Sequence, residues 1–232
     1  MAAFIAVEAL CKRYLRGQAE VRALDQVSLE LAAGSSTALM GPSGSGKTTL
    51  LNIVAGIDRP DSGRVLIDGR DVLGMSESER TAWRTRSIGY VFQFHNLMPV
   101  LTAYENVELP LLLLPLSARE RREHTLAALE AVGLLDRRDH NPRQLSGGQA
   151  QRAAIARAIV TDARILLIDE PTGNLDAEAA AEVMTLLRRL CREHGKTSLM
   201  VTHDAAAAAY AERTLRLEKG RLKSEEVPAH AP

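Results

Sequence analysis

The segment from Gly41 to Thr48, GPSGSGKT, constrains the fold of this chain more than any other. It matches G-x-x-x-x-G-K-[ST] and stands between the apolar run 37–40 and the helical pattern 49–54, which are the flanks that such a loop requires. Glycines let the backbone wrap a phosphate chain with its amides pointing inward, and a helix N-terminus adds positive potential. Lys47 is then predicted to contact β- and γ-phosphates and the Thr48 hydroxyl to bind Mg²⁺. The alternative is a plain Gly/Ser-rich loop.

Short apolar segments alternate with helical patterns along the chain, which indicates an α/β fold with a mostly parallel sheet. Two of these segments, 165–168 and 198–201, are apolar apart from Ser198, as is typical of strands buried on both faces of a sheet. A hairpin is predicted around Lys219-Gly220, between 214–217 and 221–222. The clearest other strands are expected at 64–69, 88–92, 165–168 and 198–201.

Strand signals give way to helix signals between about 95 and 160, which predicts a helical subdomain inserted into the α/β core. Ser117 to Glu120 has the form of a capping box, and Gly133 suits the residue after the end of that helix. A second long helix is expected from about 177 to 194, with Asp176 as its N-cap. We expect a single domain over 1–232, with a short loose tail at 224–232.

A phosphate loop of this kind requires a carboxylate for its metal, and the strand at 165–168 leads directly into Asp169 and Glu170. Asp169 is predicted to face the metal, and Glu170 to polarise a water against the γ-phosphate. Taken alone, such a pair is most often a solvated turn. Its occurrence together with Lys47 and Thr48 favours the catalytic interpretation.

The stretch Leu145 to Gln149, LSGGQ, predicts the N-terminus of another helix. Its backbone amides could bind a phosphate group, as at the first loop, but this stretch contains no lysine. One nucleotide cannot easily use two such sites of a single chain. Two chains facing head to tail can pair each phosphate loop with the Ser-Gly-Gly of the other. An ordinary capped helix is the alternative for this pentapeptide alone.

Composition excludes several classes of protein. The 29 basic and 29 acidic residues balance, so no overall field recruits nucleic acid or an anionic membrane. Cys11 and Cys191 stand apart from each other and from any histidine cluster, which favours reduced thiols in packing roles. The N-terminus lacks the pattern of a signal peptide, and the apolar stretch 109–116 is far shorter than the ~20 residues of a membrane span. We expect a chain that is soluble by itself.

The motifs as a set resemble the ATP-binding subunits of ABC transporters, whose signature reads LSGGQ, and the resemblance covers nearly the whole chain. It implies a P-loop NTPase core with a mostly parallel sheet, an N-terminal antiparallel β subdomain and an inserted helical subdomain. It also implies ATP hydrolysis with Mg²⁺. The residues it implicates are Tyr14 on adenine; Gly41, Ser43, Gly44, Ser45, Gly46, Lys47, Thr48 and Thr49 on phosphate; Gln93 and Asp169 with Thr48 on Mg²⁺; Glu170 and His203 in catalysis; and Ser146, Gly147, Gly148, Gln149 and Asp176 on a partner's ATP.

Some of these roles depend on the resemblance alone. Without it, Tyr14 is a packing aromatic, Gln93 a polar residue at a strand end, and His203 a capping or core histidine. Two departures from the family pattern are minor: Ala150 stands where Gln or Glu is common, and Ser35 where Glu is frequent. Neither position binds phosphate or metal.

Within the family, four stretches resemble the LolD, MacB and FtsE branch, which releases lipoproteins, exports macrolides or acts in cell division. They are 10–14, 93–99, 101–107 and 171–176. This resemblance implies a homodimer and a membrane permease of the FtsX/MacB-like type, with the chain peripheral on the cytoplasmic face of the inner membrane. The segment from Phe94 to Leu116 is expected either to receive the permease's coupling helix or to pack in the core. Two rivals remain open: a regulatory ATPase of a cell-division complex, and an ABC protein that takes no part in transport.

Overall fold

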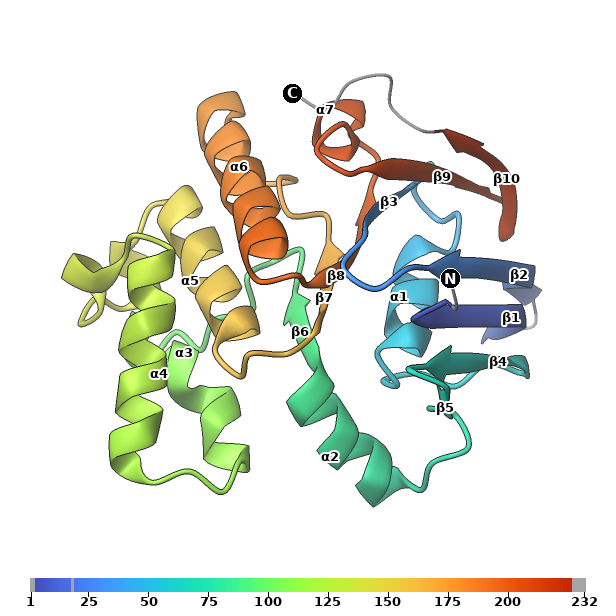
Figure 1. The fold of residues 1–232 in the computed structure, drawn as a ribbon. Coiled ribbons are helices and arrows are strands. Elements are labelled where there is room, and N and C mark those ends of the chain that lie inside the picture. The colour runs from blue at the N-terminus through green and yellow to red at the C-terminus, as the bar shows by residue number, and fades with distance from the viewer. Residues whose placement is uncertain (1–2, 18, 227–232) are drawn as a thin grey trace.

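A six-stranded sheet in the middle of the molecule separates two layers of packing (Figure 1). The computed structural model describes residues 3–17 and 19–226. The strand order is β10-β9-β3-β8-β7-β6, with parallel neighbours except in the β9-β10 hairpin. The strands are β3 (Ser36–Met40), β6 (Ile88–Val91), β7 (Ile165–Asp169), β8 (Thr197–Thr202), β9 (Arg213–Glu218) and β10 (Arg221–Glu226).

Side chains of the central strands alternate between two hydrophobic cores. Leu166 and Ile168 of β7 pack into the core beneath the large helices, whereas Ile165 and Leu167 pack into the core on the other face. Every position of β7 and of β8 is buried. The expectation of two central strands covered on both faces is therefore confirmed.

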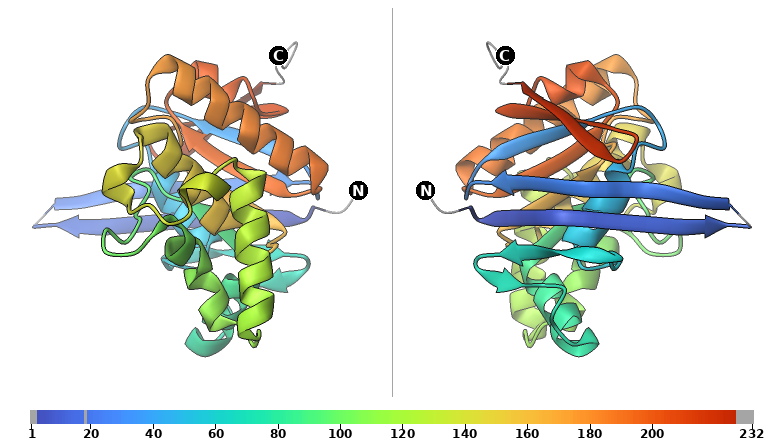
Figure 2. Two further views of the ribbon diagram at one scale, coloured as in Figure 1. Left: turned by 90° about the vertical axis from the view of Figure 1, so that its left-hand side faces the viewer. Right: turned by 90° about the vertical axis from the view of Figure 1, so that its right-hand side faces the viewer.

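The second core lies between the central sheet and a four-stranded antiparallel sheet, with α1 (Lys47–Val54) between the two (Figure 1). The order of this sheet is β2-β1-β4-β5, and the β1-β2 hairpin extends well beyond the body of the molecule (Figure 2). Its strands are β1 (Ile5–Arg16), β2 (Ala19–Leu31), β4 (Ser62–Ile67) and β5 (Arg70–Asp71). The predicted strand 64–69 ends early, because Asp68 and Gly69 have φ of +51° and +73° and turn the chain.

Helices fill the chain between β6 and β7 and gather on the opposite face of the central sheet (Figure 1). Ser117 caps α4 in the predicted capping box, and Gly133 follows its end with φ of +67°. Thr102 and Ser146 cap α3 and α5 in the same way. The elements are α3 (Ala103–Glu108), the 3-10 helix η1 (Leu109–Leu113), α4 (Ala118–Ala131), the 3-10 helices η2 (Leu135–Arg137) and η3 (Pro142–Gln144), and α5 (Gly147–Ile159).

Three further helices complete the fold. The long helix α6 (Ala177–Glu193) begins where predicted, with Asp176 Oδ1 accepting from the amide of Ala179 at 2.8 Å. The others are α2 (Glu77–Ser87), before β6, and the short α7 (Ala205–Ala208), after β8. None of the helices in the described part of the chain is both long and apolar enough to cross a bilayer. The predicted loose tail at 224–232 lies largely outside the described residues, and its first residues, 224–226, belong to β10.

Candidate functional site

The loop Gly41–Gly46 packs closely against two strands that lie far apart in sequence, β9 and β2. An added Cβ at Gly41 would lie 2.1 Å from the carbonyl oxygen of Leu217, and one at Gly46 would lie 2.2 Å from that of Ala23. Gly46 also has φ of +104° where α1 begins. Gly44, with φ of +78°, has no atom within 4 Å of an added Cβ, so only its backbone conformation favours glycine. Close packing therefore fixes the two ends of the loop.

Lys47 lies against this loop and is buried. Its ammonium donates to the carbonyl oxygens of Gly41 at 2.8 Å and Pro42 at 3.2 Å, and lies 3.8 Å from Glu170 Oε1. Because the first turn of α1 contains no acidic residue, nothing in that turn offsets the positive end of the helix. The loop therefore presents positive potential that an anionic group can use.

Asp169 ends β7 directly opposite the start of α1. Thr48 Oγ1 donates to Asp169 Oδ1 at 3.2 Å. Burial raises the pKa of the Asp169 carboxyl above its usual value; the nearby Glu170 adds to the rise, whereas the bond from Thr48 and the charge of Lys47 oppose it. Such a carboxylate gains from a cation beside it.

The pair Thr48 and Asp169 fits Mg²⁺ bound together with a phosphate. Both side chains offer hard oxygen ligands, and Mg²⁺ is commonly held by one or two carboxylates plus substrate phosphates rather than by an all-protein cage. In residues 3–17 and 19–226 no group of three or more His, Cys, Asp or Glu side chains could hold a metal ion. The third predicted ligand, Gln93, has no hydrogen bond to Thr48 or Asp169 in this part of the chain.

Glu170 follows Asp169 with φ of +45°, which a non-glycine residue rarely adopts. Its amide donates to the carbonyl of Val201 at 2.9 Å, so β8 holds the turn in place. Glu170 Oε2 accepts from His203 Nδ1 at 2.8 Å and from Thr202 Oγ1 at 3.4 Å. The carboxylate therefore lies between Lys47 and His203. Sequence reasoning missed Thr202, a buried hydroxyl at the end of an apolar strand.

Tyr14 lies on β1 close to the phosphate loop. The residue is 40% exposed, and its hydroxyl donates a short hydrogen bond to Asp58. Burial and the Asp58 carboxylate raise the pKa of this phenol, and a hydrogen bond with the Thr49 side chain opposes the rise. Since Thr49 lies in the first turn of α1, next to Lys47 and Thr48, the structure brings the predicted base platform close to the predicted phosphate residues.

Gln93 is exposed and lies two residues after the end of β6. The backbone carbonyl of Gln93 accepts from Asn174 Nδ2 at 3.5 Å. An added Cβ at Gly173 would lie 4.0 Å from Gln93 Nε2, so the amide faces the segment that leads into α6. The loop beyond it is held by Arg157 of α5, which donates to the carbonyls of His95 and Asn96 at 2.6 Å each. Sequence reasoning missed Arg157, whose partners lie about sixty residues away.

Ser146 caps α5 and is held in a capping box with Gln149. An added Cβ at Gly148 would lie 3.3 Å from Ala179 Cβ, so the start of α5 packs closely on α6. Helices α5 and α1 lie on opposite sides of the central sheet (Figure 1). Among the described residues no hydrogen bond or ion pair joins 146–149 to 41–49. A single chain thus leaves LSGGQ apart from its own phosphate loop.

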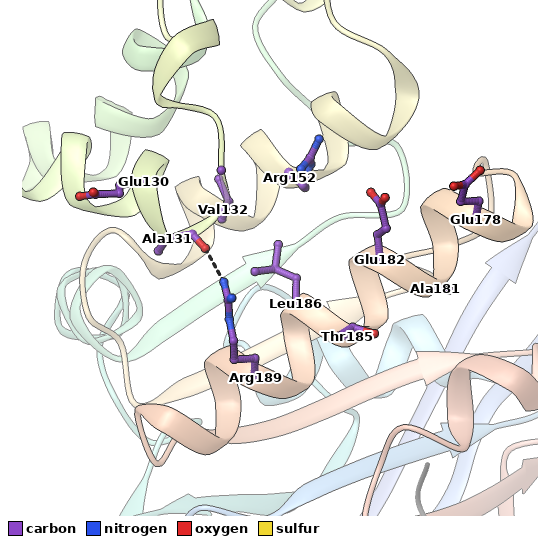
Figure 3. A pocket seen from close by; sticks show the side chains of 11 residues that line it. Glu130, Ala131, Val132, Arg152, Glu178, Ala181, Glu182, Thr185, Leu186 and Arg189 are labelled. Carbon is purple, nitrogen blue, oxygen red and sulfur yellow. Dashed lines mark hydrogen bonds between the residues drawn. The ribbon is translucent and has the colours of Figure 1, made fainter.

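Two grooves away from the phosphate loop are larger than the cavity beside it. Figure 3 shows one of about 760 Å³ between the end of α4, α5 and α6, where Arg189 donates to the carbonyl of Ala131 at 2.9 Å. A second groove of about 760 Å³ lies between α2 and η1. The cavity that adjoins the phosphate loop measures only about 210 Å³ and is lined by Gly41, Pro42 and His203, among others. A phosphate chain binds to backbone amides along a shallow loop, so volume alone does not locate this site.

Comparison with known proteins agrees with this geometry. The profile of the family described as "ABC transporter" matches residues 24–173. The chain is 46% identical over 216 residues to the lipoprotein-releasing system ATP-binding protein LolD of Bordetella pertussis, covering 93% of this chain and 94% of the relative. It is 44% identical over 224 residues to the macrolide export ATP-binding/permease protein MacB of Brucella melitensis, covering 97% of this chain but only 34% of that longer relative.

A solved structure supports the fold as well. The ATP-binding cassette MJ0796, in a dimeric post-hydrolysis state bound to ADP and Pi, superposes with a TM-score of 0.89 at 41% identity, covering 97% of this chain and 99% of that one. The predicted α/β fold of P-loop type is thereby confirmed. Sequence, fold and site geometry agree, and the chain belongs to the ABC transporter family as an ATP-binding, ATP-hydrolysing cassette of the LolD/MacB-like branch.

Proposed function

We propose that the chain binds ATP on Gly41–Thr49 and hydrolyses it with Glu170 as the group that polarises the attacking water. The observation that carries the proposal is the cluster at the carboxyl edge of the central sheet. There Glu170 lies 2.8 Å from His203 and 3.8 Å from Lys47, and Thr48 lies 3.2 Å from Asp169. Acid-base, cationic and metal-binding groups are thus collected at one end of a helix-flanked loop.

Phosphoryl transfer depends mainly on positioning and on charge stabilisation. Glu170 is proposed to take the proton of the attacking water, with Gln93 helping to orient that water. Lys47 and the amides of the loop would balance charge on the β- and γ-phosphates. His203, already hydrogen bonded to Glu170, is proposed to contact the γ-phosphate.

Mg²⁺ bound with the substrate would neutralise charge on the phosphate oxygens. Its proposed protein ligands are Thr48, Asp169 and Gln93. The base is proposed to stack on the exposed ring of Tyr14, which lies beside Thr49.

We infer further that two copies form an ATP-bound homodimer. Ser146, Gly147, Gly148 and Gln149 are separated from the phosphate loop of their own chain by the central sheet, so they suit the nucleotide of a second copy. Asp176 is the N-cap of α6, and the start of α5, which carries these residues, packs on the first turn of α6. Asp176 is therefore close to the same proposed interface. The dimeric structure of the similar cassette MJ0796 supports this arrangement.

The proposed membrane partner is a permease of the FtsX/MacB-like type. Part of the segment from Phe94 to Leu116 is core, since Val107 and Leu111 are fully buried. Other apolar side chains of that segment face solvent: Phe94 is 68%, Val100 78% and Leu113 72% exposed. The groove between α2 and η1, beside Leu113, offers a seat for the permease's coupling helix.

Docking on that permease would place the chain at the cytoplasmic face of the inner membrane. No nucleic acid is proposed as a partner, because the 29 basic and 29 acidic residues balance. The names of the similar proteins LolD and MacB favour lipoprotein release or export as the output, with mechanotransmission as the related possibility.

Hydrolysis is tested with Glu170→Gln, which removes the proposed base while keeping the side-chain size. Phosphate release is expected to fall by about 10²- to 10⁴-fold, with ATP affinity retained. Glu123→Gln, which breaks an exposed ion pair with Arg119, is the matched control and should hydrolyse ATP at the normal rate. Normal turnover by Glu170→Gln would show that another group polarises the water.

The partner is tested by affinity capture from detergent-solubilised host membranes, with tagged Glu170→Gln protein, ATP and Mg²⁺. Co-purification of a permease with a large extracytoplasmic domain is the expected result. A cell-division complex without transport activity would favour the regulatory alternative. Ribosomes or DNA-repair proteins would overturn the proposed partner.

A further inference from the structure

The hydroxyl of Tyr14 belongs to a small polar cluster that the proposed reaction does not use. Asp58 accepts from it through one carboxylate oxygen, and through the other from the ammonium of Lys12 at 3.0 Å. Lys12 also donates to the carbonyl of Arg59. Its side chain is only 13% exposed. The cluster therefore joins β1 to the loop that follows α1.

That loop is tied at both ends to elements of the nucleotide site. The amides of Ile57 and Asp58 donate to the carbonyl of Asn52 in α1, at 2.9 Å and 3.2 Å. Further on, the amide of Asp61 donates to the carbonyl of Cys11 in β1 at 2.8 Å, and Asp61 Oδ2 accepts from the amide of Arg13. Asp58 is thus fixed relative to the helix whose N-terminus carries Lys47 and Thr48.

The two faces of the Tyr14 ring differ, because Lys12 lies over one of them. Lys12 Nζ lies 5.0 Å from the ring centroid, within the range of a cation-π contact. A base must therefore use the other face of this exposed ring. Burial would raise the pKa of Asp58, but hydrogen bonds from Tyr14, Lys12 and the Arg59 amide outweigh it and hold the pKa below its usual value, so the carboxylate is charged at neutral pH.

We propose that Asp58 and Lys12 are positioning residues for the nucleotide base: they fix the tilt and distance of the Tyr14 ring relative to the phosphate loop. The inference rests on the proposed stacking of the base on Tyr14. This positioning should affect the binding of the base but not the binding of the phosphates. Loss of the cluster lets the ring move, which weakens contacts with the base and leaves contacts with the phosphates unchanged.

The test compares two probes, ATP and inorganic tripolyphosphate, each titrated with Mg²⁺ by calorimetry. Tyr14→Phe removes the phenol hydroxyl that binds Asp58, and Asp58→Asn removes the charge of the carboxylate that accepts from Tyr14 and Lys12. Both changes keep side-chain size. Each is expected to weaken ATP binding by about 3- to 10-fold and to leave tripolyphosphate binding unchanged. The double variant should lose less than the sum of the two single losses, because both changes act on the contact between Tyr14 and Asp58.

The matched control is Glu8→Gln, which breaks another carboxylate contact of β1, the exposed pair with Arg64 at 2.7 Å, and should change neither affinity. Equal ATP affinity in wild type, Tyr14→Phe and Asp58→Asn would overturn the proposal, as would a parallel loss of tripolyphosphate binding. Tyr14→Phe keeps the test decisive if Asp58→Asn folds poorly. Failure of the proposed function gives a different result: Lys47→Ala would then bind both probes as tightly as the wild type.

Discussion

At the scale of single residues, the site keeps a buried carboxylate that the fold alone does not favour. In the described part of the chain, the Asp169 side chain accepts a hydrogen bond from Thr48 and has a second carboxylate, Glu170, beside it. Burial raises its pKa, so ionising it costs folding free energy. The proposed Mg²⁺ role would account for the retained charge, since a cation beside the carboxylate favours its ionised form.

Replacing Asp169 with Asn is therefore expected to stabilise the protein in the absence of nucleotide while reducing ATP hydrolysis by at least about 100-fold. Because the folded pKa lies above the unfolded value, the free energy of unfolding of the wild type falls as pH rises through the interval between the two. The gain in free energy of unfolding of Asp169→Asn over the wild type should reach its maximum above that interval of pH and should disappear below about pH 4. Thermal unfolding at several pH values measures it.

Asp58→Asn supplies a control of opposite sign, since the folded pKa of Asp58 is lowered. Its carboxylate stabilises the fold above the unfolded pKa, and this stabilisation is lost as pH falls through the folded pKa. This variant should unfold more easily than wild type at pH 7. A lower unfolding midpoint for Asp169→Asn at pH 7 would contradict the interpretation of its burial.

Thr202 is expected to support Glu170 through its hydroxyl, which donates to the carboxylate at 3.4 Å and accepts from the amide of Asp204 at 3.0 Å. Thr202→Val should lower the turnover number by about 3- to 10-fold with little change in ATP affinity. Thr202→Ser keeps the hydroxyl and should restore turnover. A slow serine variant would mean that shape, rather than the hydrogen bond, matters at this position.

At the scale of elements, the phosphate loop is a joint between two sheets as well as a binding loop. Gly46→Ala should destabilise the fold by about 2–4 kcal/mol, because its Cβ meets the carbonyl of Ala23 and its φ is left-handed. Gly44→Ala has the same backbone problem without the steric clash and should cost about 1–2 kcal/mol. Urea unfolding of both variants gives the difference. Equal losses would refute the role assigned to the close contact.

The sequence indicated elements best where local chemistry decides them. Ser117 and Asp176 cap helices at the predicted positions, and Gly133 ends a helix as expected, since each of these signals acts within one turn. The same capping signal at Ser76-Glu79 marks α2, which was not among the helices expected from the sequence. Strands β1 and β2 were expected from the family resemblance rather than from their own pattern.

The contacts of the site were harder to predict because they join distant segments. Nothing near Asp58 in sequence points to Tyr14, 44 residues away, and the carbonyls that Arg157 binds lie at 95 and 96. The motifs at 41–48 and 169–170 identified which residues meet. They carried no information about the backbone strain at Glu170 or about the strands that hold Gly41 and Gly46 in place.

At the scale of the whole molecule, the central sheet keeps the phosphate loop and the LSGGQ helix apart. We therefore expect the active unit to be a pair of chains, each completing the nucleotide site of the other. Binding energy from ATP is then available to bring two copies together, and hydrolysis to separate them.

The most direct test is the molar mass of Glu170→Gln by light scattering, with Mg²⁺ and with or without ATP. We expect twice the 25.2 kDa of one chain when ATP is present and the mass of a single chain when it is absent. Glu170→Gln carrying Lys47→Ala should stay monomeric in both conditions. If Glu170→Gln binds ATP and yet remains a single chain, the shared nucleotide site is wrong.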